Sequence, residues 1–105
     1  MNNQFGVKLD RNGYAPSIMG EMDHCVLCGR RDRALQRHEV WHGAYRTKSK
    51  NLGCWIYICD LCHDKIHHKG GGLDQLAKAM MQHRAMEYYG WSEEEFRGFF
   101  GKSYI

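Results

Sequence analysis

The sequence predicts one small α+β domain, and three observations lead to this prediction. The chain has 105 residues, a length that fits a single domain. Two short runs, 35–41 (LQRHEVW) and 54–59 (CWIYIC), are typical of strands. Apolar residues of the C-terminal third recur at helical spacing. A core of this size is marginal by burial alone, and five Cys and seven His indicate that metal stabilises it.

The first elements are predicted from composition and turn signals. Residues 1–22 are polar and contain several glycines, so we expect an extended arm that lies on a single domain of residues 23–105. Its expected anchors are Tyr14, Ile18 and Met19. Residues 42–53, between the two predicted strands, are rich in Gly, Lys, Ser and Asn and are expected to form a loop.

Three helices are predicted after the second strand. A short helix opens at Cys62 and is expected to stop at the glycines 70–72. A longer helix ends at Gly90, and a last one begins with a capping box at Ser92 and ends at Gly101. The predicted apolar stripe of the longer helix consists of Leu73, Leu76, Ala77, Met80, Met81 and Tyr88.

Charge and hydropathy limit the classes of function. Lys and Arg number 15 against 12 Asp and Glu, a net charge of +3, and residues 30–69 hold nine of these cations against four of the acids. We therefore expect a basic surface on this segment, suited to a phosphate backbone. No apolar run approaches the roughly 20 residues of a membrane span, and no secretion signal is predicted. The thiols should then be reduced, which favours metal over disulfides.

Four cysteines form two Cys-x2-Cys pairs, Cys25/Cys28 and Cys59/Cys62, separated by 30 residues. This is the spacing of two zinc knuckles that close one tetrahedral site. Four thiolates leave no open position, so we expect one structural zinc ion. The alternative is a set of buried cysteines without metal. Cys54, the fifth cysteine, is expected to be a core residue.

The histidines suggest a second, open metal site. His63 and His67 are four residues apart on the predicted short helix, so both imidazoles project from one face. His38-Glu39 lies in the first predicted strand and can complete a site that binds a phosphate oxygen and activates water. Each histidine alone is equally compatible with a solvated or hydrogen-bonded role. We expect no shared site for His24, His42, His68 and His83.

Cys-x2-Cys-Gly, LQRHEVW and IYICDLCHDKIH together resemble the HNH (His-Me finger, ββα-metal) endonuclease family in its zinc-supported form. The resemblance implies a ββα core braced by zinc, completed here by the arm and two C-terminal helices, and one catalytic divalent ion (Mg, Mn, Ni or Zn). The chain is also similar to small phage and prophage proteins, through NGYAPSI, RHEVWHGAYRTKS and FFGKSYI. That similarity implies the cytoplasm of a bacterial host.

The resemblance also implies residue roles. His63 matches a ligand of the catalytic ion, and His67 is a further ligand or a phosphate contact. The strand motif fits in two registers: His38 is either the general base, or a ligand followed by Glu39 as the base. We prefer His38 as the base because its pKa suits water activation at neutral pH, with Glu39 as a ligand or an orienting group. The family's middle Asn has no counterpart in register, since Cys54 stands there.

Arg46 is a candidate for a bidentate phosphate contact, with Lys48 and Lys50 beside it, and the alternative is an ordinary solvated loop. The sequence therefore predicts a metal-dependent nucleic-acid phosphodiesterase, and the family resemblance favours DNA over RNA. A second hypothesis is a non-catalytic phage zinc-finger module that binds nucleic acid or a host protein. A third is a structural zinc protein of phage assembly.

Overall fold

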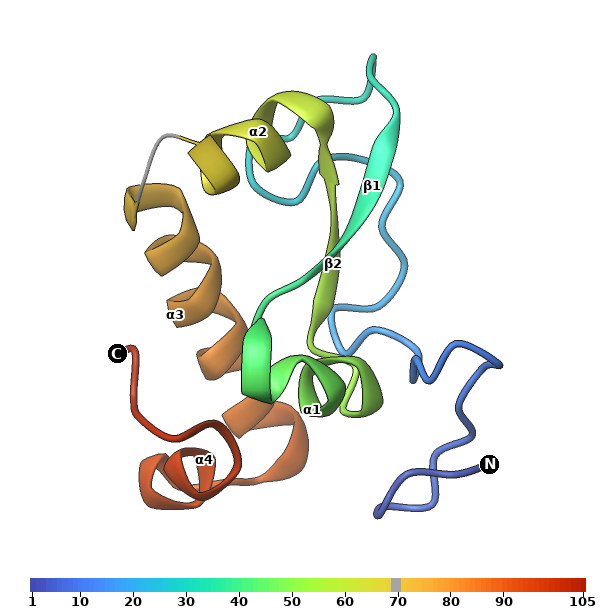
Figure 1. Cartoon of the computed structure of the whole chain (residues 1–105), viewed down its shortest axis with the longest axis vertical. Helices are drawn as coiled ribbons and strands as arrows, with labels where there is room; N and C mark the ends of the chain where they lie inside the picture. The colour runs from blue at the N-terminus through green and yellow to red at the C-terminus, as the bar shows by residue number, and fades with distance from the viewer. Residues whose placement is uncertain (69–70) are drawn as a thin grey trace.

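The computed structural model describes residues 1–68 and 71–105 and confirms a small α+β fold (Figure 1). A two-stranded antiparallel sheet and several helices make up the described part of the chain. No helix in that part combines the length and the apolar character that a membrane span requires. The elements, in chain order, are β1 (Leu35–Glu39), the 3-10 turn η1 (Gly43–Tyr45), α1 (Arg46–Asn51), β2 (Trp55–Cys59), α2 (Asp60–His68), α3 (Gly71–Tyr89) and α4 (Glu93–Phe100).

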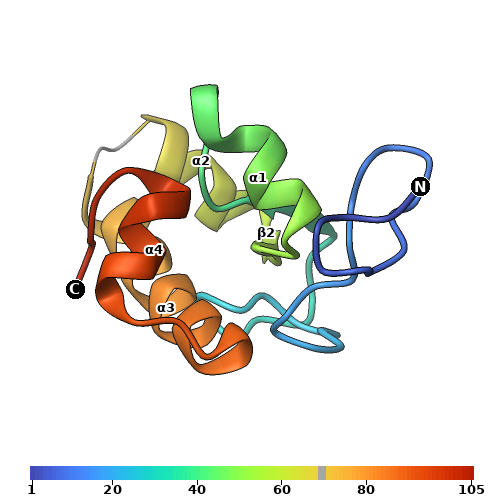
Figure 2. The same ribbon diagram turned by 90° about the horizontal axis from the view of Figure 1, so that it is seen from below.

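The β-hairpin has two faces with different surroundings. In its register His38 lies opposite Ile56, and Glu39 lies opposite Trp55. Because side chains alternate along a strand, the first pair faces one side of the sheet and the second pair faces the other. His38 and Ile56 are buried on the inner side, which α2 covers. Helix α3 lies beside α2, and α3 and α4 pack together near the C-terminus (Figure 2).

The N-terminal arm covers the outer face of the hairpin. Trp55 Nε1 donates a hydrogen bond to the carbonyl of Ala15 at 2.8 Å, and Ser17 Oγ donates to the carbonyl of Trp55 at 2.7 Å. Ile18 belongs to the core, as expected, and its amide donates to Gly53 O at 3.0 Å. Gly53 has a φ of +73°, and a Cβ at this position would collide with the carbonyl of Pro16. The close approach of the arm therefore requires glycine here.

The loop predicted over residues 42–53 was wrong, since η1 and α1 occupy most of it. Its sequence has no apolar periodicity, and a helix this short depends on tertiary contacts. Ser49 supplies them from a fully buried position: its Oγ accepts from the Trp41 amide at 3.2 Å and donates to Cys54 O at 2.6 Å. Helix α1 is thus fastened to the ends of both strands. The first strand, predicted over residues 35–41, ends at Glu39, and beyond it Val40 N still donates a hydrogen bond to Cys54 O at 3.1 Å.

The C-terminal helices differ from the prediction in two details. Of the glycines expected to end the short helix, Gly70 lies outside the described residues, whereas Gly71 and Gly72 open α3. Leu76 and Tyr88 were wrongly placed in the buried stripe, because both are more than half exposed. The stripe that packs inward instead follows one-turn spacing through Ala77, Met81 and Ala85. Both halves of the predicted capping box at Ser92 are present, and Gly101 ends α4 as predicted.

Candidate metal centres

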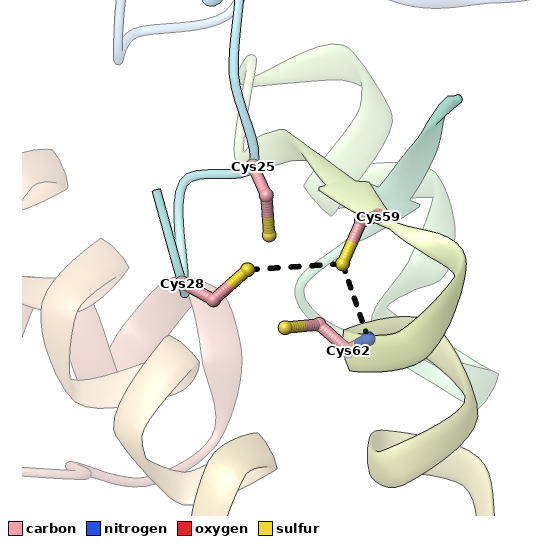
Figure 3. A group of neighbouring side chains, drawn as sticks. All are labelled: Cys25, Cys28, Cys59 and Cys62. Atoms are coloured by element: carbon pink, nitrogen blue, oxygen red, sulfur yellow. Dashed lines mark hydrogen bonds between the residues drawn. The ribbon is translucent and has the colours of Figure 1, made fainter. Parts of the chain in front are cut away.

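The four cysteines of the two Cys-x2-Cys pairs come together at one end of the hairpin (Figure 3). Cys25 and Cys28 lie on a turn before β1, while Cys59 ends β2 and Cys62 lies in the first turn of α2. The amide of Gly29, a residue with a φ of +78°, closes the first turn by donating to the carbonyl of Cys25 at 2.8 Å. The predicted cluster is therefore present, formed by one turn before β1 and by the junction of β2 with α2.

The distances within this cluster fit a tetrahedral metal ion. The four sulfurs all lie within 4.8 Å of one another, and Cys28 Sγ and Cys59 Sγ are 3.8 Å apart. Four sulfurs at about 2.3 Å from one zinc ion are separated from each other by about 3.8 Å. All five cysteines of the chain are free thiols, so no disulfide competes for these sulfurs. The cluster can hold a structural metal ion such as zinc.

The electrostatics of the cluster also favour a cation. Burial opposes ionisation of Cys25, yet hydrogen bonds from the backbone of Cys59 and Cys28 outweigh it and lower the pKa of Cys25 to about 6. Burial and the neighbouring thiols raise the pKa of Cys62. Four thiolates repel one another at this distance, and a divalent cation removes that repulsion. Cys54, by contrast, is fully buried outside the cluster, and burial raises the pKa of its thiol, as expected of a core residue.

A second group of donors, the histidine cluster, is formed by His38, His63 and His67. His38 projects from β1, and the other two project from one face of α2. One ring nitrogen of each lies within 4.8 Å of the others, and the two Nε2 atoms of α2 are 3.0 Å apart. Two nitrogens at about 2.1 Å from one ion, in neighbouring positions, are about 3.0 to 3.4 Å apart. The histidine cluster therefore has the spacing of ligands to one metal ion.

The hydrogen bonds of these histidines also fit a metal. Nε2 of His38 is buried and has no hydrogen-bond partner among the described residues, which is costly for a polar atom unless a ligand satisfies it. Nδ1 of His63 is 2.5 Å from Gln36 Oε1. When Nδ1 donates to this oxygen, Nε2 keeps its lone pair for a ligand. His67 is exposed, so the site is open to solvent on one side.

Two rings of the histidine cluster, those of His38 and His63, have lowered pKa values. Burial first, and then the nearby His42 and His63, lower the pKa of His38 to about 4. Burial and the imidazole of His67 also lower the pKa of His63. A metal ligand must be unprotonated, and the fold thus holds these two rings in the form that binds a cation.

Glu39, expected as a ligand or an orienting group, lies on the outer face of β1. Its Oε1 accepts from Tyr14 OH and from Arg46 Nε, both at 2.9 Å. Burial opposes the ionisation of Glu39, but the hydrogen bond from Arg46 leaves its pKa lowered. The structure does not bring Glu39 or Arg46 to the histidine cluster. Lys48 Nζ donates to the carbonyl of Phe99 at 3.0 Å, and Lys50 Nζ lies 4.8 Å from the centre of the Tyr14 ring.

The sequence interpretation missed two residues beside the histidine cluster. His42, which was expected to share no site, has its ring centre 5.0 Å from that of His38. Asp74, in the first turn of α3, forms a group with these two histidines, their donor atoms within 4.8 Å of one another. No local pattern could reveal this grouping, because it depends on how η1 and α3 pack against β1. Of the other isolated histidines, His24 Nδ1 lies 2.8 Å from Asp23 Oδ1, and His68 Nε2 lies 3.6 Å from Asp64 Oδ1.

Comparison with protein-family models, with the curated proteins and with the solved structures found no match to this chain. Its function therefore has to be inferred from its own residues.

Proposed function

We propose that the protein is a divalent-metal-dependent nucleic-acid phosphodiesterase of the HNH type, as the sequence resemblance implies, acting on DNA. One observation carries the proposal: His38, His63 and His67 bring one ring nitrogen each within 4.8 Å of the others, at a site that is open to solvent at His67, and Nε2 of the buried His38 has no partner among the described residues. A closed thiolate cluster at the start of the same helix, α2, would hold that helix against the hairpin. A site closed by four thiolates has no free coordination position, whereas an open imidazole site can bind a water molecule or a phosphate oxygen.

In this proposal His63 and His67 hold the ion, and Gln36 orients His63. The bound ion would stabilise negative charge on the phosphate and on the leaving oxygen. His38 is unprotonated at pH 7 and would accept the proton of the attacking water. Burial lowers its pKa to about 4, so it is a weaker base than the free imidazole that the sequence suggested. Its burial and its distance to the two α2 rings are equally compatible with a role as third ligand. If His38 is the base, its removal should leave the metal affinity unchanged; if it is a ligand, its removal should lower the metal affinity.

The test is nicking of supercoiled plasmid DNA in Mg²⁺ or Mn²⁺ by the wild type and by single alanine variants. His38→Ala and His63→Ala should both abolish nicking and leave the fold intact. Loss of a general base costs roughly 10² to 10⁴ in rate and spares metal binding, whereas loss of a ligand weakens it. His68→Ala, which removes an exposed imidazole of the same helix, is the matched control and should cut normally.

The register of the strand motif is tested in the same assay. Complete loss of nicking in Glu39→Ala, with partial activity in His38→Ala, would make Glu39 the base instead. If the wild type, loaded with either ion, cuts neither DNA nor RNA in single- or double-stranded form, the proposal is wrong.

A second candidate function is a non-catalytic module that binds nucleic acid or a host protein. It is favoured by the basic side chains of α1, which do not face the histidine cluster. If they bind phosphates, affinity should fall with salt, and removal of their charge should flatten the salt dependence. Binding that does not change with salt would point to a protein partner. The variant for this test combines Arg46→Gln, Lys48→Gln and Lys50→Gln.

A further inference from the structure

We propose that His42 and Asp74 form a second divalent-cation site with His38, separate from the one proposed on α2. The donors come from three places in the fold: His38 lies in β1, His42 directly precedes η1, and Asp74 lies in the first turn of α3. One donor atom of each lies within 4.8 Å of the other two. His63 and His67 do not belong to this group, so a cation here would be held without α2.

Two buried atoms in this group lack partners. Oδ1 of Asp74 and Nε2 of His38 are both buried without a hydrogen bond from any described residue. The other carboxylate oxygen of Asp74, Oδ2, pairs with Lys78 Nζ at 2.9 Å. The side chain of His38 is 1% exposed, so bulk water does not reach its Nε2. A cation between these atoms would satisfy both, whereas a buried acceptor left without a partner destabilises the fold.

The donor set indicates the class of ion. Two imidazoles and one carboxylate suit Zn²⁺, Co²⁺, Ni²⁺, Mn²⁺ or Fe²⁺, whereas Ca²⁺ prefers a shell of oxygens. His42 is exposed, and the remaining coordination positions are therefore open to water. The site would be accessible and exchangeable, unlike the cysteine cluster.

The inference goes beyond the proposed phosphodiesterase and does not depend on it, although His38 is common to both groups and its Nε2 can bind only one ion at a time. The probe is Co²⁺, added to zinc-loaded protein of full length. Ligation by nitrogen and oxygen gives weak visible absorption without the charge-transfer bands of Co²⁺ bound to thiolate. The background is H63Q/H67Q, which removes both α2 donors and keeps their approximate volume.

We expect folded H63Q/H67Q still to bind Co²⁺ with this spectrum. Adding D74N or H42Q should weaken binding by more than the roughly 10- to 100-fold that loss of an outer-shell partner costs. Adding D64N, an exposed carboxylate on α2, should change nothing. The inference is overturned if folded H63Q/H67Q binds no Co²⁺, or if H42Q and D74N leave its affinity unchanged.

If circular dichroism shows H63Q/H67Q to be unfolded, the wild type and D74N are compared by NMR in Co²⁺. A contact-shifted imidazole N–H of His42, which only a coordinated ring gives, should be present in the wild type and lost in D74N. Its absence from the wild type overturns the inference. Because no readout involves cleavage, an inactive protein can still support the second site, and an active one can still refute it.

Discussion

Cys28→Ser is the most informative perturbation of the cysteine cluster, because Cys28 is the exposed member. Its replacement removes a thiolate ligand but leaves no cavity in the core. Structural zinc contributes on the order of 10 kcal/mol in small domains, and the whole stability of a domain is typically about 5 to 15 kcal/mol. Losing one of four ligands should therefore cost several kcal/mol, and the variant should unfold or aggregate.

Cys54→Ser is the matched control, because Cys54 is fully buried and outside the cluster. It places a hydroxyl in the core, which costs about 1 to 3 kcal/mol, and it should keep the zinc. Burial alone predicts that Cys54→Ser lowers the free energy of unfolding more than Cys28→Ser does, and the zinc site predicts the opposite order. Urea unfolding followed by circular dichroism, with zinc content measured on the same samples, gives both quantities. Full stability and full zinc content in Cys28→Ser would refute the assignment.

Three further predictions concern the fold around the sites. Ser49→Ala leaves the buried amide of Trp41 unpaired and removes one of the two hydrogen bonds to Cys54 O, so it should lower the free energy of unfolding by about 1 to 3 kcal/mol, while the exposed Thr47→Ala should change it little; equal effects would contradict this. Gly53→Ala should cost at least about 2 kcal/mol more than Gly20→Ala in urea unfolding, since both residues have positive φ but only Gly53 meets a carbonyl. Burial holds the pKa of His38 at about 4, below its usual 6.5, so unfolding between these pH values takes up a proton. The free energy of unfolding should therefore fall as the pH drops from 6.5 to 4, by up to about 3 kcal/mol relative to His38→Gln. Parallel pH profiles of the wild type and His38→Gln would contradict this.

The strands, the last helix and the cysteine cluster were predictable because their signals are local. The two Cys-x2-Cys pairs each fix two sulfurs on one turn, and the capping box at Ser92 marks a helix start within four residues. The spacing of His63 and His67 on one helix has the same local character. Helix α1 has no such signal: it depends on Ser49, whose partners lie at the ends of two strands.

Tertiary packing likewise decides the surroundings of His38. Because side chains alternate along a strand, the sequence predicts that His38 and Glu39 lie on opposite faces of the sheet. It does not predict which of the two faces packs against α2. The arm settles this, since Tyr14 binds Glu39 on the outer face. His42 and Asp74 are brought together by elements far apart in the sequence, and only the fold reveals them.

The central claim is that α2 joins a closed thiolate site to an open imidazole site, and metal analysis tests it most directly. Purified wild-type protein is exposed to a chelator, dialysed against Mn²⁺ or Co²⁺, and analysed for bound metal. The account predicts one zinc ion per chain that resists the chelator, together with an exchangeable divalent ion whose binding to the α2 histidines is weaker in His63→Ala and unchanged in His68→Ala. One zinc ion and no exchangeable ion would contradict it.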